Sequence, residues 1–359
     1  ILQSITGWSI YESIFIIGII TLIYTVSGGL KAVIHIDAFQ FVIYLISAFI
    51  CIFFLFTYLD NTIYESINFV YNSNKLKVFN FSNNILTSPF AFFSAFIGGT
   101  MLSFASHGSD YMLVQRVLAT KNIKSARKAM IGSGVFVLFQ FLLFLFIGSL
   151  IYIISDCIMI EKDREISYVI NQILPIGFKG VVIAGVLSAA MSTLSSSINS
   201  LSSSTLRDWF PNIKSLKISR FVTIIWTGIL IISAIIFNNV DNALVIVGLK
   251  IASFTYGVLL SFFILVKLGK FKTENIIIGY ASGILTVFML SYLEIAWTFY
   301  ILGSIISNIT IVLMLEKFKK IHLIRDILIF SFFVCSIFLL INRNQIHQNT
   351  KIIDVDIKE

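Results

Sequence analysis

Small hydroxyl side chains recur at helical spacing in the segment GVLSAAMSTLSSSINSLSSST, residues 185–205. Residues three and four apart share one face of a helix, so these oxygens converge on one side. A small hard cation prefers several oxygen ligands, and a main-chain carbonyl one turn earlier adds another. Close helix packing through small residues gives the same pattern, and the spacing leaves both interpretations open. The stripe consists of Ser188, Ser192, Ser195, Ser196, Asn199, Ser200 and Ser203.

A second polar feature lies in the apolar run 89–117, which also holds His107 and Asp110. Glycine-interrupted membrane helices are typical of discontinuous helices, whose freed backbone groups bind substrate. The alternative is a helix that ends early and places both ionisable residues at the membrane interface. The interrupting residues are Gly98, Gly99 and Gly108.

Two isolated charges complete the candidate chemistry. Asp37 follows a tight turn at Gly28-Gly29, and we expect it in the first turn of the next helix. The helix dipole stabilises a carboxylate there, so capping alone would explain Asp37. Lys250 stands alone in an apolar helix. It either reaches to the outer surface or faces a cavity, where it would bind an anion or replace a cation.

The composition predicts the environment of these groups. Of 359 residues, 57% are hydrophobic and 12% are charged, about half the charged fraction of a soluble domain. This excludes a soluble enzyme, and three cysteines exclude a disulfide framework. In a membrane protein, the basic residues behind the net charge of +8 indicate which connections face the cytoplasm. We therefore expect no nucleic-acid partner.

Ten apolar runs are long enough to cross a membrane, which takes about 20 helical residues. They are continuous rather than alternating, which excludes the strands of a membrane barrel. We therefore predict an all-α polytopic protein with a transmembrane domain at 1–342 and a short polar tail at 343–359. The runs are 11–30, 38–59, 89–117, 129–154, 176–206, 219–238, 243–266, 275–295, 297–315 and 325–342.

The connections between the runs alternate in charge. Basic residues fill every second connection, including those at 116–128, 207–220 and 267–272. Basic connections stay on the cytoplasmic side, so the first helix is predicted to run inward and the tail to lie outside. The outside connection 60–88 is rich in Asn and Ser, and we expect a solvated loop there.

Three segments resemble the sodium:solute symporter family: IYTVSGGLKAVIHIDAFQ at 23–40, GSDYMLVQRVLATKNIKSARKAM at 108–130 and LPIGFKGVVIAGVLSAAMSTLSSSINSLSSSTL at 174–206. They occur in the family's order. The resemblance implies the inverted five-plus-five helix repeat of the leucine-transporter type and alternating access around a midplane site. Family members typically have about 13 helices, so we expect that the first three or so, including the first broken helix, precede Ile1.

The resemblance also implies two sodium sites. The common site would use the carbonyl of Ala189 and the hydroxyls of Ser192 and Thr193. A second site, found in the family's sialic acid transporters, would use the carboxylate of Asp37 with Ser192, Ser195 and Ser196.

The substrate residues implied by the resemblance match less well. Ser103 and Ser106 stand where sugar-transporting members have an Asn and an aromatic gate, next to His107. The sugar-binding Lys of those members aligns near Val137, with Gln140 one turn on, which argues against a glucose- or galactose-like solute. Lys250 lies on a helix that contacts substrate in the family, so an acidic solute is conceivable.

The sequence thus predicts a multi-pass transporter of the plasma membrane, in bacteria the inner membrane, and not an enzyme. It would couple the entry of sodium, which is co-transported, to uptake of a sugar, sialic acid, carboxylate or amino acid. We expect no organic cofactor, contacts with solute and lipid, and a monomeric transport unit. The alternatives are a symporter-like sensor, which would need a cytoplasmic catalytic domain after the last helix, and a passive channel, whose flux would ignore sodium.

Overall fold

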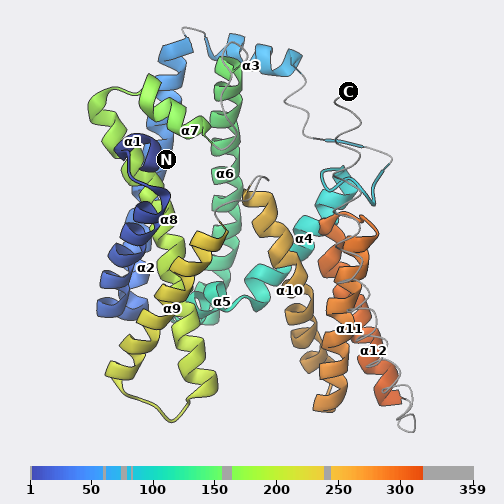
Figure 1. The fold of residues 1–359 in the computed structure, drawn as a ribbon. Helices are drawn as coiled ribbons and strands as arrows, with labels where there is room; N and C mark the ends of the chain where they lie inside the picture. Colours follow the sequence, from blue (N-terminus) through green and yellow to red (C-terminus); the bar gives the residue numbers. More distant parts are fainter. Residues whose placement is uncertain are drawn as a thin grey trace, which may run out of the picture. The chain divides into compact units, whose positions relative to one another are not determined.

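The computed structural model describes residues 2–59, 62–73, 79–81, 84–155, 164–237 and 244–317. Helices make up most of these residues, and no strand occurs among them (Figure 1). The chain forms two compact units. Unit 1 contains Ile1–Val78 and Tyr111–Leu244, and unit 2 contains Phe79–Asp110 and Val245–Glu359. The predicted run 325–342 and the tail lie outside the described residues.

Helix α2, Ile10–Leu59, is a hairpin of two segments. Its 50 residues would span about 75 Å as one straight helix, more than twice the membrane's hydrocarbon core. Gly29 interrupts the helical backbone with φ 57° and ψ −164°, a conformation that glycine adopts without steric cost. The predicted turn at Gly28-Gly29 is therefore present.

Contacts with α8, Ile176–Ser204, show that α2 reverses direction at this turn. Before the turn, the Tyr24 hydroxyl bonds to the carbonyl of Met191, and Gly28 lines a cavity with Ser203 farther along α8. After the turn, Asp37 bonds to Ser195, and Ser47 meets Gly185. The contact positions on α8 first rise and then fall, so the second segment runs back along α8.

Unit 1 also contains two further long helices, α6 (Ile123–Ser155) and α9 (Leu216–Ile236). Pro175 immediately precedes the first residue of α8, a position where its missing N–H costs no helical hydrogen bond. The shorter elements are α1 (Leu2–Thr6), α3 (Ile63–Asn72), α5 (Tyr111–Leu118), α7 (Glu165–Tyr168) and the π-helical turns η1 (Val169–Ile173) and η2 (Thr205–Trp209).

Helix α3 corrects the prediction of a solvated loop at 60–88. Its first turn is closed by a capping box, in which the Glu65 carboxylate accepts from the Thr62 backbone at 2.8 Å and the Thr62 hydroxyl accepts from the Glu65 N–H. The bonds from the Thr62 backbone and hydroxyl lower the pKa of Glu65. Ser66 and Val70 are buried, so packing adds to the cap in a helix too short to persist alone.

Unit 2 contains α4 (Phe92–Ser109), α10 (Leu244–Leu268), α11 (Thr273–Tyr292), the 3-10 turn η3 (Trp297–Phe299) and α12 (Tyr300–Lys317). Within the run 89–117, α4 ends at Ser109 and α5 begins at Tyr111, so an interruption is present, but not at Gly98 and Gly99. That it forms a discontinuous membrane helix stays a prediction. The backbone is helical through both, and Asp110 is the extended residue between α4 and α5. Gly98 instead allows close packing, because a Cβ there would lie 2.4 Å from the Cβ of Thr298.

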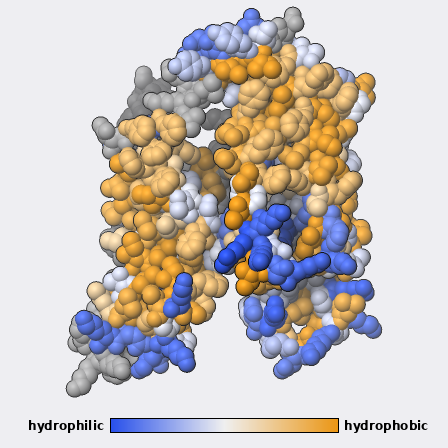
Figure 2. Space-filling model, turned by 180° about the vertical axis from the view of Figure 1, so that it is seen from behind, coloured by the Kyte–Doolittle hydropathy of each residue, from blue (hydrophilic) through white to orange (hydrophobic). Residues whose placement is uncertain are grey.

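Seven helices among the described residues are long and apolar enough to cross a membrane, fewer than the ten predicted. Two predicted runs form the single helix α2, the polar α4 does not qualify, and the tenth run is not described. Large apolar side chains such as Val135, Phe139 and Leu142 are exposed along these helices. Figure 2 shows that apolar side chains cover the flanks of the helices and hydrophilic ones gather toward their ends. The chain is therefore a multi-pass membrane protein.

Candidate functional site

Helix α8 carries the oxygen atoms predicted for the common sodium site. The hydroxyl of Thr193 lies 3.2 Å from the carbonyl oxygen of Ala189, so both oxygens belong to one turn and one side of the helix. Thr193 is exposed, while Ser192 and Ala189 are partly buried. The Ser192 hydroxyl has no hydrogen-bond partner in the part of the chain that the structure describes. The Ala189 carbonyl and the Thr193 hydroxyl thus lie together on α8, and their assembly with Ser192 into a sodium site stays a prediction.

Three residues of the second predicted set, Asp37, Ser195 and Ser196, meet between α2 and α8 through their side chains. The Ser195 hydroxyl donates to one oxygen of Asp37 at 3.3 Å, and the Ser196 hydroxyl donates to the other at 3.2 Å. Both hydroxyls also lie within bonding distance of the Ser192 carbonyl oxygen, at 3.0 and 2.7 Å. Asp37 is 8% exposed, and a buried carboxylate is unfavourable unless hydrogen bonds or a positive charge stabilise it.

The structure corrects the interpretation of Asp37 as a helix cap. The second segment of α2 resumes after Gly29, so Asp37 lies two turns inside a helix rather than in its first turn. Its carboxylate bonds to side chains of α8 and α5. Capping therefore does not explain this residue.

Arg116 of α5 is a member of this cluster that the sequence analysis missed. Its guanidinium lies 2.5 Å from Asp37 and also donates to Ser196. The sequence analysis counted Arg116 only as a basic residue of an inner connection. A signal was present, because Arg116 and its neighbour Gln115 fall within the predicted apolar run 89–117. Gln115 also contacts α8, since its side-chain oxygen accepts from Asn199 at 3.3 Å.

The residues proposed for substrate divide between the two units. In unit 2, the ring nitrogen Nδ1 of His107 lies 3.0 Å from the carbonyl oxygen of Ser103 and 3.1 Å from the Ser106 hydroxyl, so their polar groups contact one another along α4. Lys250 is exposed on α10. In unit 1, Gln140 of α6 donates to the Tyr44 hydroxyl at 3.1 Å. The structure thus brings Ser103, Ser106 and His107 together on α4. The assembly of all five residues into one site stays a prediction.

A second interaction missed from the sequence lies at the helix break. The Tyr256 hydroxyl of α10 donates to the Asp110 carboxylate at 2.6 Å. This bond ties the residue at the interruption to a neighbouring helix of unit 2. A tyrosine among many in apolar helices gave no signal in the sequence.

The comparison with protein families agrees with the geometry on α2 and α8. The model of the "Sodium:solute symporter family" matches residues 1–268. The chain belongs to this family. Members with similar sequences include sodium-coupled monocarboxylate transporter 2 of Bos taurus, 26% identical over 307 residues, which are 81% of this chain and 49% of the relative. The sodium/iodide cotransporter of Homo sapiens is 28% identical over 309 residues, covering 79% and 46%.

A solved structure shares the fold. A Na+-coupled sialic acid symporter in its substrate-bound outward-open state matches 88% of this chain and 68% of its own, with a TM-score of 0.76 and 20% identity. The chain spans about half the length of the curated relatives it matches. Both named relatives are sodium-coupled transporters.

Proposed function

We propose that this chain takes part in sodium-coupled symport of a small organic solute across the plasma membrane by alternating access. The observation that carries the proposal is the cluster of oxygens on α8, which one buried carboxylate of α2 joins. Carboxylate, hydroxyl and carbonyl oxygens are the ligands of small hard cations. The named relatives transport iodide, monocarboxylates and other solutes with sodium, which supports the same coupling here.

The common sodium ion would bind the Ala189 carbonyl and the hydroxyls of Ser192 and Thr193. These groups lie on a partly exposed face of α8, so other parts of the transporter would complete the shell. Such a shell assembles and disassembles when helices on either side of the ion move. Sodium would thereby stabilise the outward-open state, and the inverted five-plus-five repeat would provide the two alternating arrangements.

A second sodium ion would bind at Asp37, Ser192, Ser195 and Ser196, in exchange for the guanidinium of Arg116. Two positive charges beside one carboxylate repel each other, so the site favours one of them at a time. Arg116 is 33% exposed, so its side chain can leave toward water at modest cost. Each sodium ion that enters adds about 2.3 kcal/mol of driving force at 100 mV, roughly a 50-fold gradient.

For the solute, we propose a small organic anion and rank monocarboxylates first. Lys250 is an exposed cation on an apolar helix, and none of the described residues pairs with it. Serines at 103 and 106 and Val137 depart from the sugar-transporting pattern. The sodium-coupled monocarboxylate transporters among the relatives support the same class. Ser103, Ser106, His107 and Gln140 would contribute polar contacts in a transport unit that is a monomer.

Uptake into proteoliposomes tests this proposal. Purified protein, with any further segments of its natural transporter, is reconstituted and offered labelled monocarboxylates, sugars, sialic acid and amino acids, with an inward gradient of sodium or of choline. We expect concentrative uptake of a monocarboxylate with sodium and none with choline. Equal uptake in both gradients would identify a passive channel and refute the coupling.

A further inference from the structure

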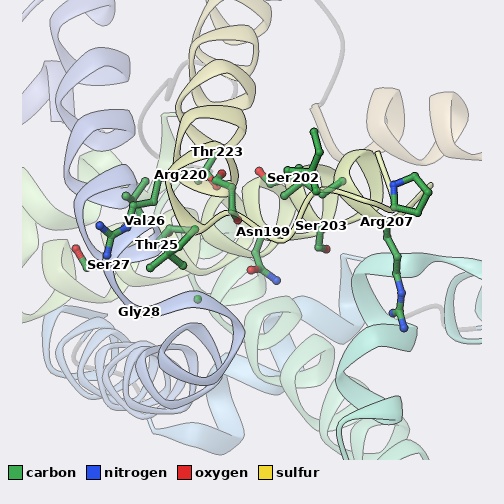
Figure 3. Close-up of a pocket in the computed structure, with 16 residues that line it drawn as sticks. Thr25, Val26, Ser27, Gly28, Asn199, Ser202, Ser203, Arg207, Arg220 and Thr223 are labelled. Atoms are coloured by element: carbon green, nitrogen blue, oxygen red, sulfur yellow. The ribbon is translucent and has the colours of Figure 1, made fainter. Parts of the chain in front are cut away.

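Unit 1 contains a cavity of about 560 Å³, with both polar and apolar lining residues, that the proposed transport cycle does not use. It lies at the hairpin turn of α2 and is closed by the end of α8, by η2 and by the start of α9 (Figure 3). Hydroxyl groups form much of its wall, including the buried Thr25, Ser202 and Thr223. Arg207 and Arg220 are exposed lining residues, and Figure 3 shows their side chains ending at opposite sides of the cavity.

The charges around this cavity favour an anion. Arg207 and Arg220 are among its lining residues, and no acidic residue is. Neither arginine forms an ion pair with another residue that the structure describes. Asp208, next in sequence to Arg207, accepts from Ser204 at 2.7 Å and does not line the cavity. A sodium ion would be repelled here, whereas an oxyanion would gain charge-assisted hydrogen bonds.

The hydroxyl groups can donate hydrogen bonds to an anion without leaving a backbone carbonyl unpaired. Thr25, Ser202 and Thr223 each donate to the carbonyl of the residue four positions earlier, at 2.7, 2.7 and 2.9 Å. A hydroxyl hydrogen rotates freely, and the helix N–H still bonds to the same carbonyl. Ser215, which precedes α9, makes no capping bond with its side chain, so the positive end of the α9 dipole also faces this region.

We propose that this cavity binds a phosphate group. Arginine forks match phosphate oxygens in pairs, and several hydroxyls can bond to the remaining oxygens. The volume is large for a bare ion and suits a phosphate ester. The cavity lies where apolar helices end, in the connection that also carries Lys214 and Lys217. Lipid headgroups lie at this depth, so the ester is either the headgroup of an anionic phospholipid or a free phosphate ester.

Native mass spectrometry of the purified chain in detergent tests the site, with phosphatidylglycerol, diacylglycerol and glycerol 3-phosphate as probes. We expect one phosphatidylglycerol to bind saturably and diacylglycerol, which lacks the phosphate, not to bind. Arg207→Gln/Arg220→Gln should weaken binding by about tenfold or more. The matched control Lys214→Gln/Lys217→Gln removes the same charge from the same connection outside the cavity and should leave binding unchanged.

Two further measurements distinguish the sources of phosphate and show whether a loss of binding reflects misfolding. Competition by glycerol 3-phosphate would assign a free phosphate ester, and its absence would assign the lipid; both support a phosphate site. Arg207→Lys/Arg220→Lys keeps the charge but loses the paired bonds, and intermediate binding would show that the glutamine variant fails through chemistry rather than folding. Equal losses in the cavity and control variants, or equal binding of both lipids, would overturn the proposal.

Discussion

Arg116→Gln should raise the affinity for sodium, although it removes half of a buried ion pair. In the structure, Arg116 lies 2.5 Å from the Asp37 carboxylate, where the second sodium ion is proposed to bind. A sodium ion at Asp37 would be about 5 Å from a guanidinium that stayed in place. Two unit charges repel at that distance by about 3 kcal/mol at an effective dielectric constant of about 20. Loss of the guanidinium therefore removes a competitor of sodium.

Solvent reduces this repulsion energy, because Arg116 is 33% exposed and can turn toward water when sodium binds. We therefore expect an effective repulsion of about 1.4 kcal/mol. That corresponds to roughly tenfold tighter sodium binding in Arg116→Gln. Equilibrium binding of radioactive sodium to the purified protein measures the change directly, without the need for transport.

The carboxylate provides the control for this experiment. Asp37→Asn keeps the size and hydrogen bonding of the side chain but removes its charge, so it should abolish the second site and lower the Hill coefficient for sodium toward one. The double variant should behave like Asp37→Asn, because Arg116 has nothing left to neutralise. If Arg116→Gln instead weakened sodium binding as much as Asp37→Asn, the ion pair would be a structural support of the site and the competition argument would be wrong.

Three further predictions concern separate parts of the protein. Ser192→Ala/Thr193→Ala should raise the sodium concentration needed for half-maximal uptake by at least about tenfold, whereas Ser200→Ala/Ser204→Ala, on the same helix, should leave it unchanged; sodium-activation curves measure both. Lys250→Met should raise the KM for an anionic solute without changing sodium binding, and an unchanged KM would favour the snorkelling interpretation. Gly185→Leu should lower the Tm by about 5 °C, because a side chain there meets Ser47, as thermal unfolding followed by tryptophan fluorescence can measure. The control Gly180→Leu, which has open space around its Cβ, should leave the Tm unchanged.

The sequence was most informative where the chemistry is local to one helix. The hydroxyl spacing on α8 follows from helix geometry, so its oxygens could be placed on one face before any fold was known. The meeting of Asp37 with Ser195 and Ser196 was also predicted, from the resemblance to the family. In the structure it occurs because the turn at Gly28-Gly29 brings α2 back along α8.

Tertiary packing explains what the sequence analysis missed. Arg116 has the same residue type as the loop cations around it, and only the fold directs its guanidinium to Asp37. Gly98 resembles a helix break but instead makes room for Thr298. Helix α3 was hidden because the connection 60–88 as a whole is rich in Asn and Ser, although the Thr62 and Glu65 spacing of a capping box was present in the sequence.

The interlocked contact of α2 with α8 bears on the choice between alkali ions. A Cβ at Gly185 would lie 2.0 Å from the Ser47 hydroxyl oxygen, so the two helices touch there at backbone distance and cannot slide past each other by a residue. The same two helices carry Asp37 and the serines that face it. Because their spacing is fixed about three turns away, the oxygens around Asp37 cannot easily spread to fit a larger ion. The site would then reject potassium because the helix pair is stiff, although the same oxygen ligands could bind either ion.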